Sequence, residues 1–187
     1  MLVHGYFVVL AFFSLGMALI SRYIKQRKEG KDFLEKPPID KFDFYAGKIA
    51  LLSTWMFFIL TAILPGLSFI RVPVVLSWTA VGLLYAGSLI ILIAYKNMGS
   101  NLSVGIPNES SHLITTGLYG LSRNPIYFGV FLIGLASCLY FPDLINISFF
   151  LFGIFIQHRI IIGEEAFLSA RFGSEWNQYR TRVRRYI

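Results

Sequence analysis

Three long apolar stretches alternate with short polar segments over the first half of the chain. They run from about Val3 to Ile20, from about Tyr45 to Leu64, and from about Val74 to Tyr95. Each comes close to the roughly 20 residues that a helix needs to cross the hydrocarbon core of a membrane. Pro65-Gly66 ends the second stretch, and a short linker leads to the third. The pattern predicts a scaffold of three spanning helices over residues 1–95.

A second apolar region covers residues 126–163 and is interrupted by Phe141-Pro142-Asp143. Because proline ends one helix and can begin the next, this region predicts a helical hairpin. Both of its helices would be short, and short spans tilt or thin the bilayer. The predicted fold is an all-α integral membrane protein with five transmembrane helices. The whole chain, residues 1–187, forms one domain, and residues 96–187 carry its polar motifs.

Composition agrees with this class and excludes several others. Only 14% of the residues are charged and 56% are hydrophobic, whereas soluble domains carry about 25% charged residues. The net charge of +7 comes from basic residues that flank apolar stretches, which argues against nucleic acid as a partner. Cys138 is the lone cysteine, so no internal disulfide forms and no zinc site is expected. Neither a dinucleotide glycine fingerprint nor a phosphate-binding loop is present.

The distribution of lysine and arginine predicts an orientation. Five basic residues follow the first apolar stretch and none precedes it, so we expect no cleaved signal peptide there. The positive-inside rule then puts the N-terminus outside and residues 21–44 in the cytoplasm. With five spans, residues 96–125 and the tail from about residue 164 also face the cytoplasm, and Arg71 is the clear exception.

Polar side chains gather where the fourth span begins. Asn124 precedes Pro125, an order typical of an N-cap followed by the first helical residue. Arg123 there is either a snorkelling arginine or part of an anion site with the free N–H groups of the helix. Tyr119 and Tyr127 are either interfacial anchors or the walls of an aromatic pocket for a cation such as a sulfonium.

The fifth span ends in a second polar cluster, Glu164-Glu165, preceded by His158 and Arg159. Adjacent residues of a helix point about 100° apart, so one carboxylate should face a site and the other a basic partner or water. His158 is either a base or a structural histidine.

The tail from residue 166 carries apolar residues at helical spacing. The spacing predicts an amphipathic helix with a break at Gly173, and we expect this helix to fold over the polar clusters as a lid. Its arginines would lie at the anionic cytoplasmic leaflet; they are Arg180, Arg182, Arg184 and Arg185.

At these residues the chain resembles the superfamily of isoprenylcysteine carboxyl methyltransferases and phospholipid methyltransferases, over roughly residues 96–187. The matching elements are Ser111-His112-Leu113-Ile114, Gly117-Leu118-Tyr119, Arg123-Asn124-Pro125-Ile126-Tyr127, Glu164-Glu165, and Phe172-Gly173 followed by Trp176 and Tyr179. Members are integral membrane enzymes that use S-adenosylmethionine.

The resemblance implies a cytoplasmic cofactor pocket covered by the C-terminal helix. The residues expected to bind the cofactor are Ser111, His112, Leu113, Ile114, Tyr119, Asn124, Pro125, Ile126, Tyr127 and Glu164. The expected catalytic residues are Arg123, Arg159 and Glu165. Asn124 replaces the family's usual histidine and cannot take up a proton near neutral pH, so it does not act as a base.

The acceptor implied by the resemblance is a lipid or isoprenoid within the membrane. A carboxylate needs no base, and Arg123 or Arg159 could position it. An amine or a thiol would need a base such as Glu165 or His158. The absence of an obvious base favours the carboxylate of an isoprenylcysteine-like substrate. The alternatives are phospholipid N-methylation, small-thiol S-methylation, an NADPH-dependent membrane reductase, and a non-enzymatic transporter or adaptor.

Overall fold

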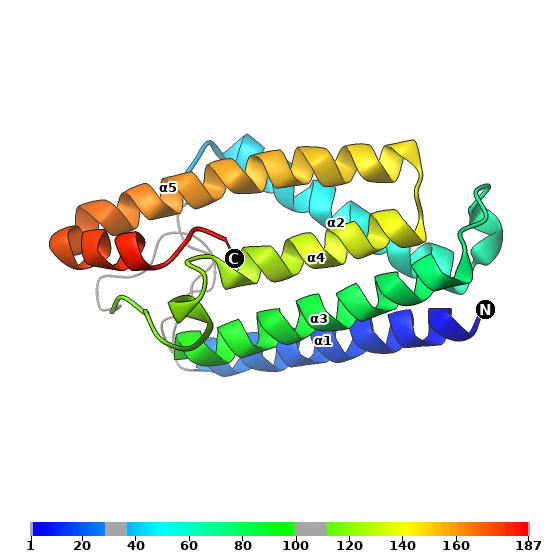
Figure 1. Cartoon of the computed structure of the whole chain (residues 1–187), viewed down its shortest axis with the longest axis horizontal. Coiled ribbons are helices and arrows are strands. Elements are labelled where there is room, and N and C mark those ends of the chain that lie inside the picture. The colour runs from blue at the N-terminus through cyan, green and yellow to red at the C-terminus, as the bar shows by residue number, and fades with distance from the viewer. Residues whose placement is uncertain (1, 29–36, 100–111, 187) are drawn as a thin grey trace.

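The computed structural model describes residues 2–28, 37–99 and 112–186, and over these residues the chain is helical without a strand. The α-helices are α1 (Val3–Lys28), α2 (Lys41–Ile63), α3 (Val74–Met98), α4 (Pro125–Tyr140) and α5 (Leu144–Arg182). Two 3-10 turns, η1 (Pro65–Leu67) and η3 (Gly117–Gly120), lie before α3 and before α4. Figure 1 shows the five helices gathered in one bundle, with α2 running obliquely behind α4 and α5.

Four of the helices, α1, α2, α3 and α5, are long and apolar enough to cross a membrane. The three long helices predicted for the first half of the chain are therefore confirmed. With 16 residues, α4 is about 24 Å long, which is less than the roughly 30 Å of the hydrocarbon core. The prediction of five spans thus rests on whether α4 crosses the bilayer.

The fifth helix differs from the sequence-based expectation. We predicted a short fifth span that ends at Glu164-Glu165 and then an amphipathic helix from residue 166, but the two are continuous in α5, which covers 39 residues with a bend at Gly173. An apolar run marks where a helix lies in the membrane, and it does not mark where the helix ends. Because neither proline nor glycine occurs in residues 164–172, the helix extends beyond its apolar part as far as the bend at Gly173.

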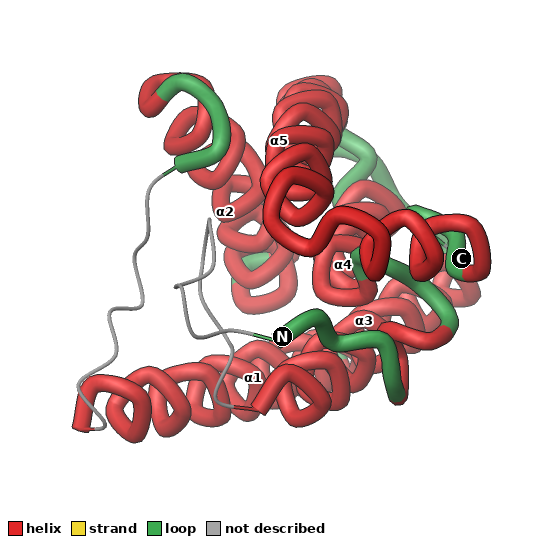
Figure 2. The backbone as a smooth tube through the Cα atoms, turned by 90° about the vertical axis from the view of Figure 1, so that its left-hand side faces the viewer, coloured by secondary structure: helices red, strands yellow, loops and turns green. Residues whose placement is uncertain are grey.

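Helix packing is closest between α3 and α4 and between α2 and α5, and α1 lies along α2 and α3 (Figure 2). The backbones of α3 and α4 touch at a pair of glycines. A Cβ atom added to Gly129 would lie 2.7 Å from the carbonyl oxygen of Gly87. Small residues of this kind let membrane helices approach each other closely.

The buried core and the outer surface have the arrangement of a membrane protein. Large apolar side chains of α1 to α4 meet in the interior, among them Val8, Phe58, Leu84 and Ile133. Other large apolar side chains, such as Phe155 at 61% exposure, point outward from the long helices. Such surfaces suit contact with lipid tails.

The C-terminal segment bends back on the bundle. Gly173 has φ +49° and ψ −113°, which confirms the predicted break, and the chain then doubles back toward the start of α4 (Figure 1). Trp176, Tyr179 and Val183 form a buried cluster against Leu113. The tail therefore packs onto the segment that leads into α4.

Candidate functional site

The start of α4 is tied to the tail by its own polar side chains. Pro125 is the first residue of α4 and Asn124 occupies the predicted N-cap position, but the Asn124 side chain makes no capping bond. Its Nδ2 donates to Oε1 of Glu165 at 3.1 Å and to the carbonyl oxygen of Arg185 at 3.2 Å. The predicted N-cap position of Asn124 is confirmed, but its side-chain amide links α4 to α5 and to the tail instead of capping the helix.

Glu165 is the centre of a four-residue network that we call the clamp, made of Arg123, Asn124, Glu165 and Arg185. Nε and Nη2 of Arg123 donate to the two carboxylate oxygens at 3.1 and 3.2 Å. Nη2 of Arg185 donates to Oε2 at 3.0 Å, and the Glu165 side chain is only 12% exposed. This shared carboxylate raises the pKa of Arg185 above its ordinary value. We expected Arg185 to lie at the leaflet, and that placement stays a prediction.

Arg123 also holds the backbone of the tail. Its Nη1 donates to the carbonyl oxygens of Arg180 at 3.2 Å and Val183 at 2.7 Å. Its backbone N–H donates to the carbonyl oxygen of Arg184 at 2.9 Å. Every nitrogen of the guanidinium therefore has a protein acceptor. This geometry favours a positioning role for Arg123 and Glu165, and their predicted catalytic roles stay predictions.

Glu164 points away from the clamp, as we expected for one carboxylate of the pair. The Tyr127 hydroxyl of α4 donates to Oε1 of Glu164 at 2.8 Å. Lys48 of α2 interacts electrostatically with this carboxylate, and its Nζ lies 4.0 Å from the centre of the Phe44 ring. Glu164 is half-buried and forms no ion pair with any described arginine. Lys48 was missed as a site residue, although a charge inside an apolar stretch was a usable signal.

Tyr119 is held beside this pair by the turn η3. The Tyr179 hydroxyl donates to the Tyr119 carbonyl oxygen at 2.7 Å, and Tyr119 itself is buried. Burial raises the pKa of Tyr119 well above its ordinary value, and the nearby Tyr95, Tyr179 and Glu164 raise it further. The Tyr119 hydroxyl therefore stays neutral.

Gly117 makes the turn possible. Its φ of +63° is a left-handed conformation, and a Cβ there would lie 2.5 Å from Oδ1 of Asn97. That same Oδ1 accepts a bond from the backbone N–H of Leu118 at 3.0 Å. The turn therefore docks on the end of α3, which positions Tyr119.

The other predicted cofactor residues differ in where they lie. Pro125 is buried and Ile126 is half-buried in the first turn of α4. Leu113 packs against the tail cluster, Ile114 is half-buried, and His112 is exposed. Ser111 lies outside the described residues.

Arg159 and His158 have partners outside the clamp. Arg159 forms an ion pair with Asp43 of α2, and the Arg159 side chain is 46% exposed. Nδ1 of His158 shares a hydrogen bond of 2.8 Å with the Tyr186 hydroxyl. Burial raises the pKa of Tyr186, so the tyrosine is neutral in this pair. Both side chains thus have protein partners that join α5 to α2 and to the tail.

The chemistry of the site follows from its side chains. Two tyrosine rings and the Glu164 carboxylate suit a positively charged group, which aromatic faces and carboxylates attract. Among the described residues, no group of three or more histidine, cysteine or acidic side chains could hold a metal ion.

A comparison with curated proteins finds no significant match. The family model for phospholipid methyltransferase matches residues 75–175, from the start of α3 to just past the bend of α5. This range is more than half of the chain and includes Tyr119, Tyr127 and Glu164 as well as three of the four clamp residues. The chain is therefore a multi-pass membrane protein that belongs to the phospholipid methyltransferase family.

Proposed function

We propose that this protein transfers a methyl group from S-adenosylmethionine to a lipidic acceptor at the cytoplasmic face of the membrane. Family membership supports methyl transfer. The observation that carries the proposal is the hydrogen bond between Tyr127 of α4 and Glu164 of α5, with Tyr119 beside it. These groups lie at the end of the bundle that the positive-inside rule assigns to the cytoplasm.

The described residues fit this cofactor. S-adenosylmethionine, when bound, supplies an electrophilic methyl group on a sulfonium cation. Glu164 would attract that positive charge, and the rings of Tyr119 and Tyr127 would face it. We propose that the remaining cofactor contacts come from residues 111–114 and from Asn124, Pro125 and Ile126.

The clamp would keep the site closed. Methyl transfer is an in-line displacement, so a protein promotes it chiefly by aligning two reactants and excluding water. The clamp fixes the tail against the start of α4, and the tail buries Trp176 and Tyr179 over the segment after residue 112. In this proposal Arg123 and Glu165 act through the tail and do not touch the reacting atoms.

The acceptor is the part of the proposal that the geometry changes most. The sequence favoured a carboxylate held by Arg123 or Arg159. Arg123 donates from each of its nitrogens to the protein, and Arg159 is paired with Asp43. A carboxylate acceptor therefore loses the two side chains that were expected to hold it.

An amine acceptor gains support from Glu164. A base must be free to accept a proton, and Glu165 is already paired with two arginines. Glu164 has one hydroxyl donor and no described arginine partner. We therefore propose a phospholipid amine as the acceptor, with Glu164 as proton acceptor. An isoprenylcysteine-like carboxylate is the second candidate, because the chain resembles both branches of the superfamily.

An activity assay distinguishes these acceptors. The purified protein in nanodiscs would receive methyl-labelled S-adenosylmethionine with either phosphatidylethanolamine or a prenylated cysteine. We expect label in phosphatidylethanolamine, and a fall in kcat/KM of about 100-fold or more in Glu164→Gln. The matched control is Glu175→Gln, since Glu175 is an exposed carboxylate on the same helix and should leave the rate unchanged. Label in the prenylated cysteine alone would select the second candidate. Folded protein that labels neither lipid would contradict the proposal, and binding of NADPH would then indicate a reductase.

A further inference from the structure

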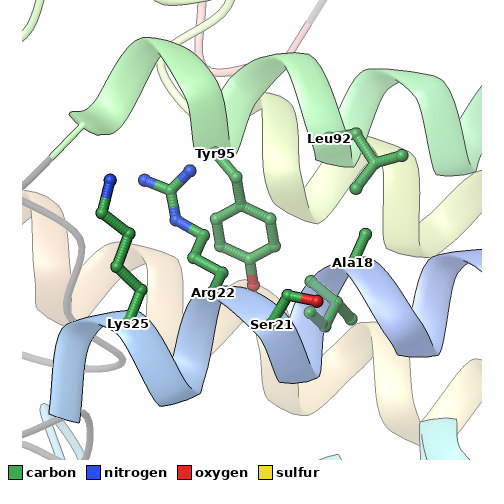
Figure 3. Close-up of a pocket in the computed structure, with 7 residues that line it drawn as sticks. Ala18, Ser21, Arg22, Lys25, Leu92 and Tyr95 are labelled. Atoms are coloured by element: carbon green, nitrogen blue, oxygen red, sulfur yellow. The ribbon is translucent and has the colours of Figure 1, made fainter. Parts of the chain in front are cut away.

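A cleft between α1 and α3 borders the site described above, because Arg22 and Tyr95, which line it, interact electrostatically with Tyr119. Its volume is about 370 Å³, and Figure 3 shows the side chains that surround it. The lining residues are Ala18, Leu19, Ser21, Arg22, Lys25, Leu92 and Tyr95. None of them belongs to the clamp or to the Tyr127–Glu164 pair.

The cleft changes from apolar to basic along α1. Ala18, Leu19 and Leu92 line its apolar end, whereas Arg22 and Lys25 line the end nearest the C-terminus of α1. Residues three or four apart share one face of a helix, which places Ala18, Arg22 and Lys25 in one row. Figure 3 shows the Arg22 and Lys25 side chains both reaching from α1 toward α3. The gradient matches a molecule with an anionic head and an apolar tail.

Arg22 is fixed in place and keeps a free donor. Its Nη2 donates to the carbonyl oxygen of Gly99 at 2.6 Å, and its guanidinium carbon lies 5.7 Å from the centre of the Tyr95 ring. Its Nε is buried and has no acceptor among the described residues. Because this Nε is buried, an anion in the cleft would meet the other, exposed atoms of Arg22 and Lys25.

The charge of the cleft also calls for an anion. Arg22 and Lys25 contribute two positive charges, and no acidic residue is among the described residues that line the cleft. Guanidinium and ammonium groups form their strongest hydrogen bonds with phosphate and carboxylate oxygens. The cleft is far larger than the roughly 30 Å³ that one water occupies. It therefore has room for a phosphate headgroup and the first methylenes of a lipid.

We propose that this cleft binds an anionic phospholipid from the surrounding membrane, with its phosphate on Arg22 and Lys25 and the start of an acyl chain along Leu19 and Leu92. A lipid is favoured over a free anion because the apolar end of the cleft would gain nothing from phosphate alone. The basic end of a spanning helix is also where anionic headgroups concentrate. This lipid is proposed as a bound ligand and not as the methyl acceptor. Its binding is measured without methyl transfer, so this inference and the proposed function can fail separately.

The test is a calorimetric titration of the detergent-purified protein with three probes. They are short-chain phosphatidylglycerol, short-chain phosphatidylcholine and inorganic phosphate. We expect phosphatidylglycerol to bind at least tenfold more tightly than either of the others. The variant Arg22→Gln/Lys25→Gln should weaken that binding at least tenfold. The matched control Arg27→Gln/Lys28→Gln removes the same charge from exposed positions of the same helix. It should change the affinity for phosphatidylglycerol less than threefold.

Three results would overturn the inference. Equal losses in the two double variants would mean that general surface charge attracts the lipid. Equally tight binding of phosphatidylcholine would show that the cleft does not require an anionic headgroup. Phosphate binding as tight as that of phosphatidylglycerol would indicate a site for a free anion. Because Arg22 also bonds to Gly99, Lys25→Gln alone serves as the variant that leaves this contact intact. It should weaken phosphatidylglycerol binding about threefold, and unchanged binding would count against the proposal.

Discussion

The clamp predicts a large loss of stability when Glu165 is neutralised. Glu165→Gln keeps the shape of the side chain but removes the charge that Arg123 and Arg185 share. Removing one partner of a buried ion pair costs about 3–5 kcal/mol. The Arg185 side chain is 36% exposed and can return to water, whereas that of Arg123 is 11% exposed. A glutamine oxygen also still accepts one bond, so we expect a loss of about 2–3 kcal/mol.

Thermal unfolding of the detergent-purified protein measures this effect. For a chain of this size, about 1 kcal/mol lowers Tm by roughly 2–4 °C, so Glu165→Gln should lower it by about 5–10 °C. Limited proteolysis should cut the variant first in the tail, because the clamp holds that segment.

The matched control for this variant is Asp43→Asn. It breaks the Asp43–Arg159 pair, in which both side chains are more exposed than Glu165. Exposed pairs contribute about 0.2–1 kcal/mol, so the control should shift Tm by no more than about 4 °C. Equal shifts in the two variants, with no increase in tail cleavage, would refute the reasoning that the clamp fixes the tail.

Three further substitutions test the close contacts around the site, each followed by thermal unfolding. Gly117→Ala should cost about 1–2 kcal/mol, because alanine disfavours φ +63° and its Cβ meets the Asn97 amide; an unchanged Tm would show that the turn can relax. Gly129→Val should cost about 3 kcal/mol or more, because α3 and α4 must move apart; wild-type stability would contradict the backbone contact. Tyr179→Phe should cost about 1 kcal/mol through the lost bond to the Tyr119 carbonyl, and a neutral effect would mean that water replaces the hydroxyl.

Local pattern was enough to predict most of the helices. Apolar stretches of about 20 residues gave the positions of α1, α2 and α3, and the proline at 142 gave the turn between α4 and α5. The bend at Gly173 was predicted from spacing alone. The continuity of α5 across Glu164 and Glu165 was not predicted, because the span and the amphipathic tail have separate apolar patterns and the pattern does not show whether they join.

The candidate site was predictable in its residues but not in its pairings. Helical geometry predicted that Glu164 and Glu165 diverge, which their contacts with Tyr127 and Arg123 confirm. Tyr127 lies 37 residues from Glu164 and Arg123 lies 42 residues from Glu165, and only the fold brings each pair together. The partnership of Arg185 with Glu165 follows from the reversal of the tail, which spacing cannot specify.

Binding of S-adenosylhomocysteine to the detergent-purified protein, measured by calorimetry, tests the cofactor site most directly. Binding should be clear in the unaltered protein and at least tenfold weaker in Glu164→Gln. In Tyr127→Phe it should be weaker by a smaller factor, because the carboxylate remains. The control Glu175→Gln should bind like the unaltered protein. Absence of binding in the folded protein, or equal affinity in Glu164→Gln, would contradict the placement of the cofactor against Tyr127 and Glu164.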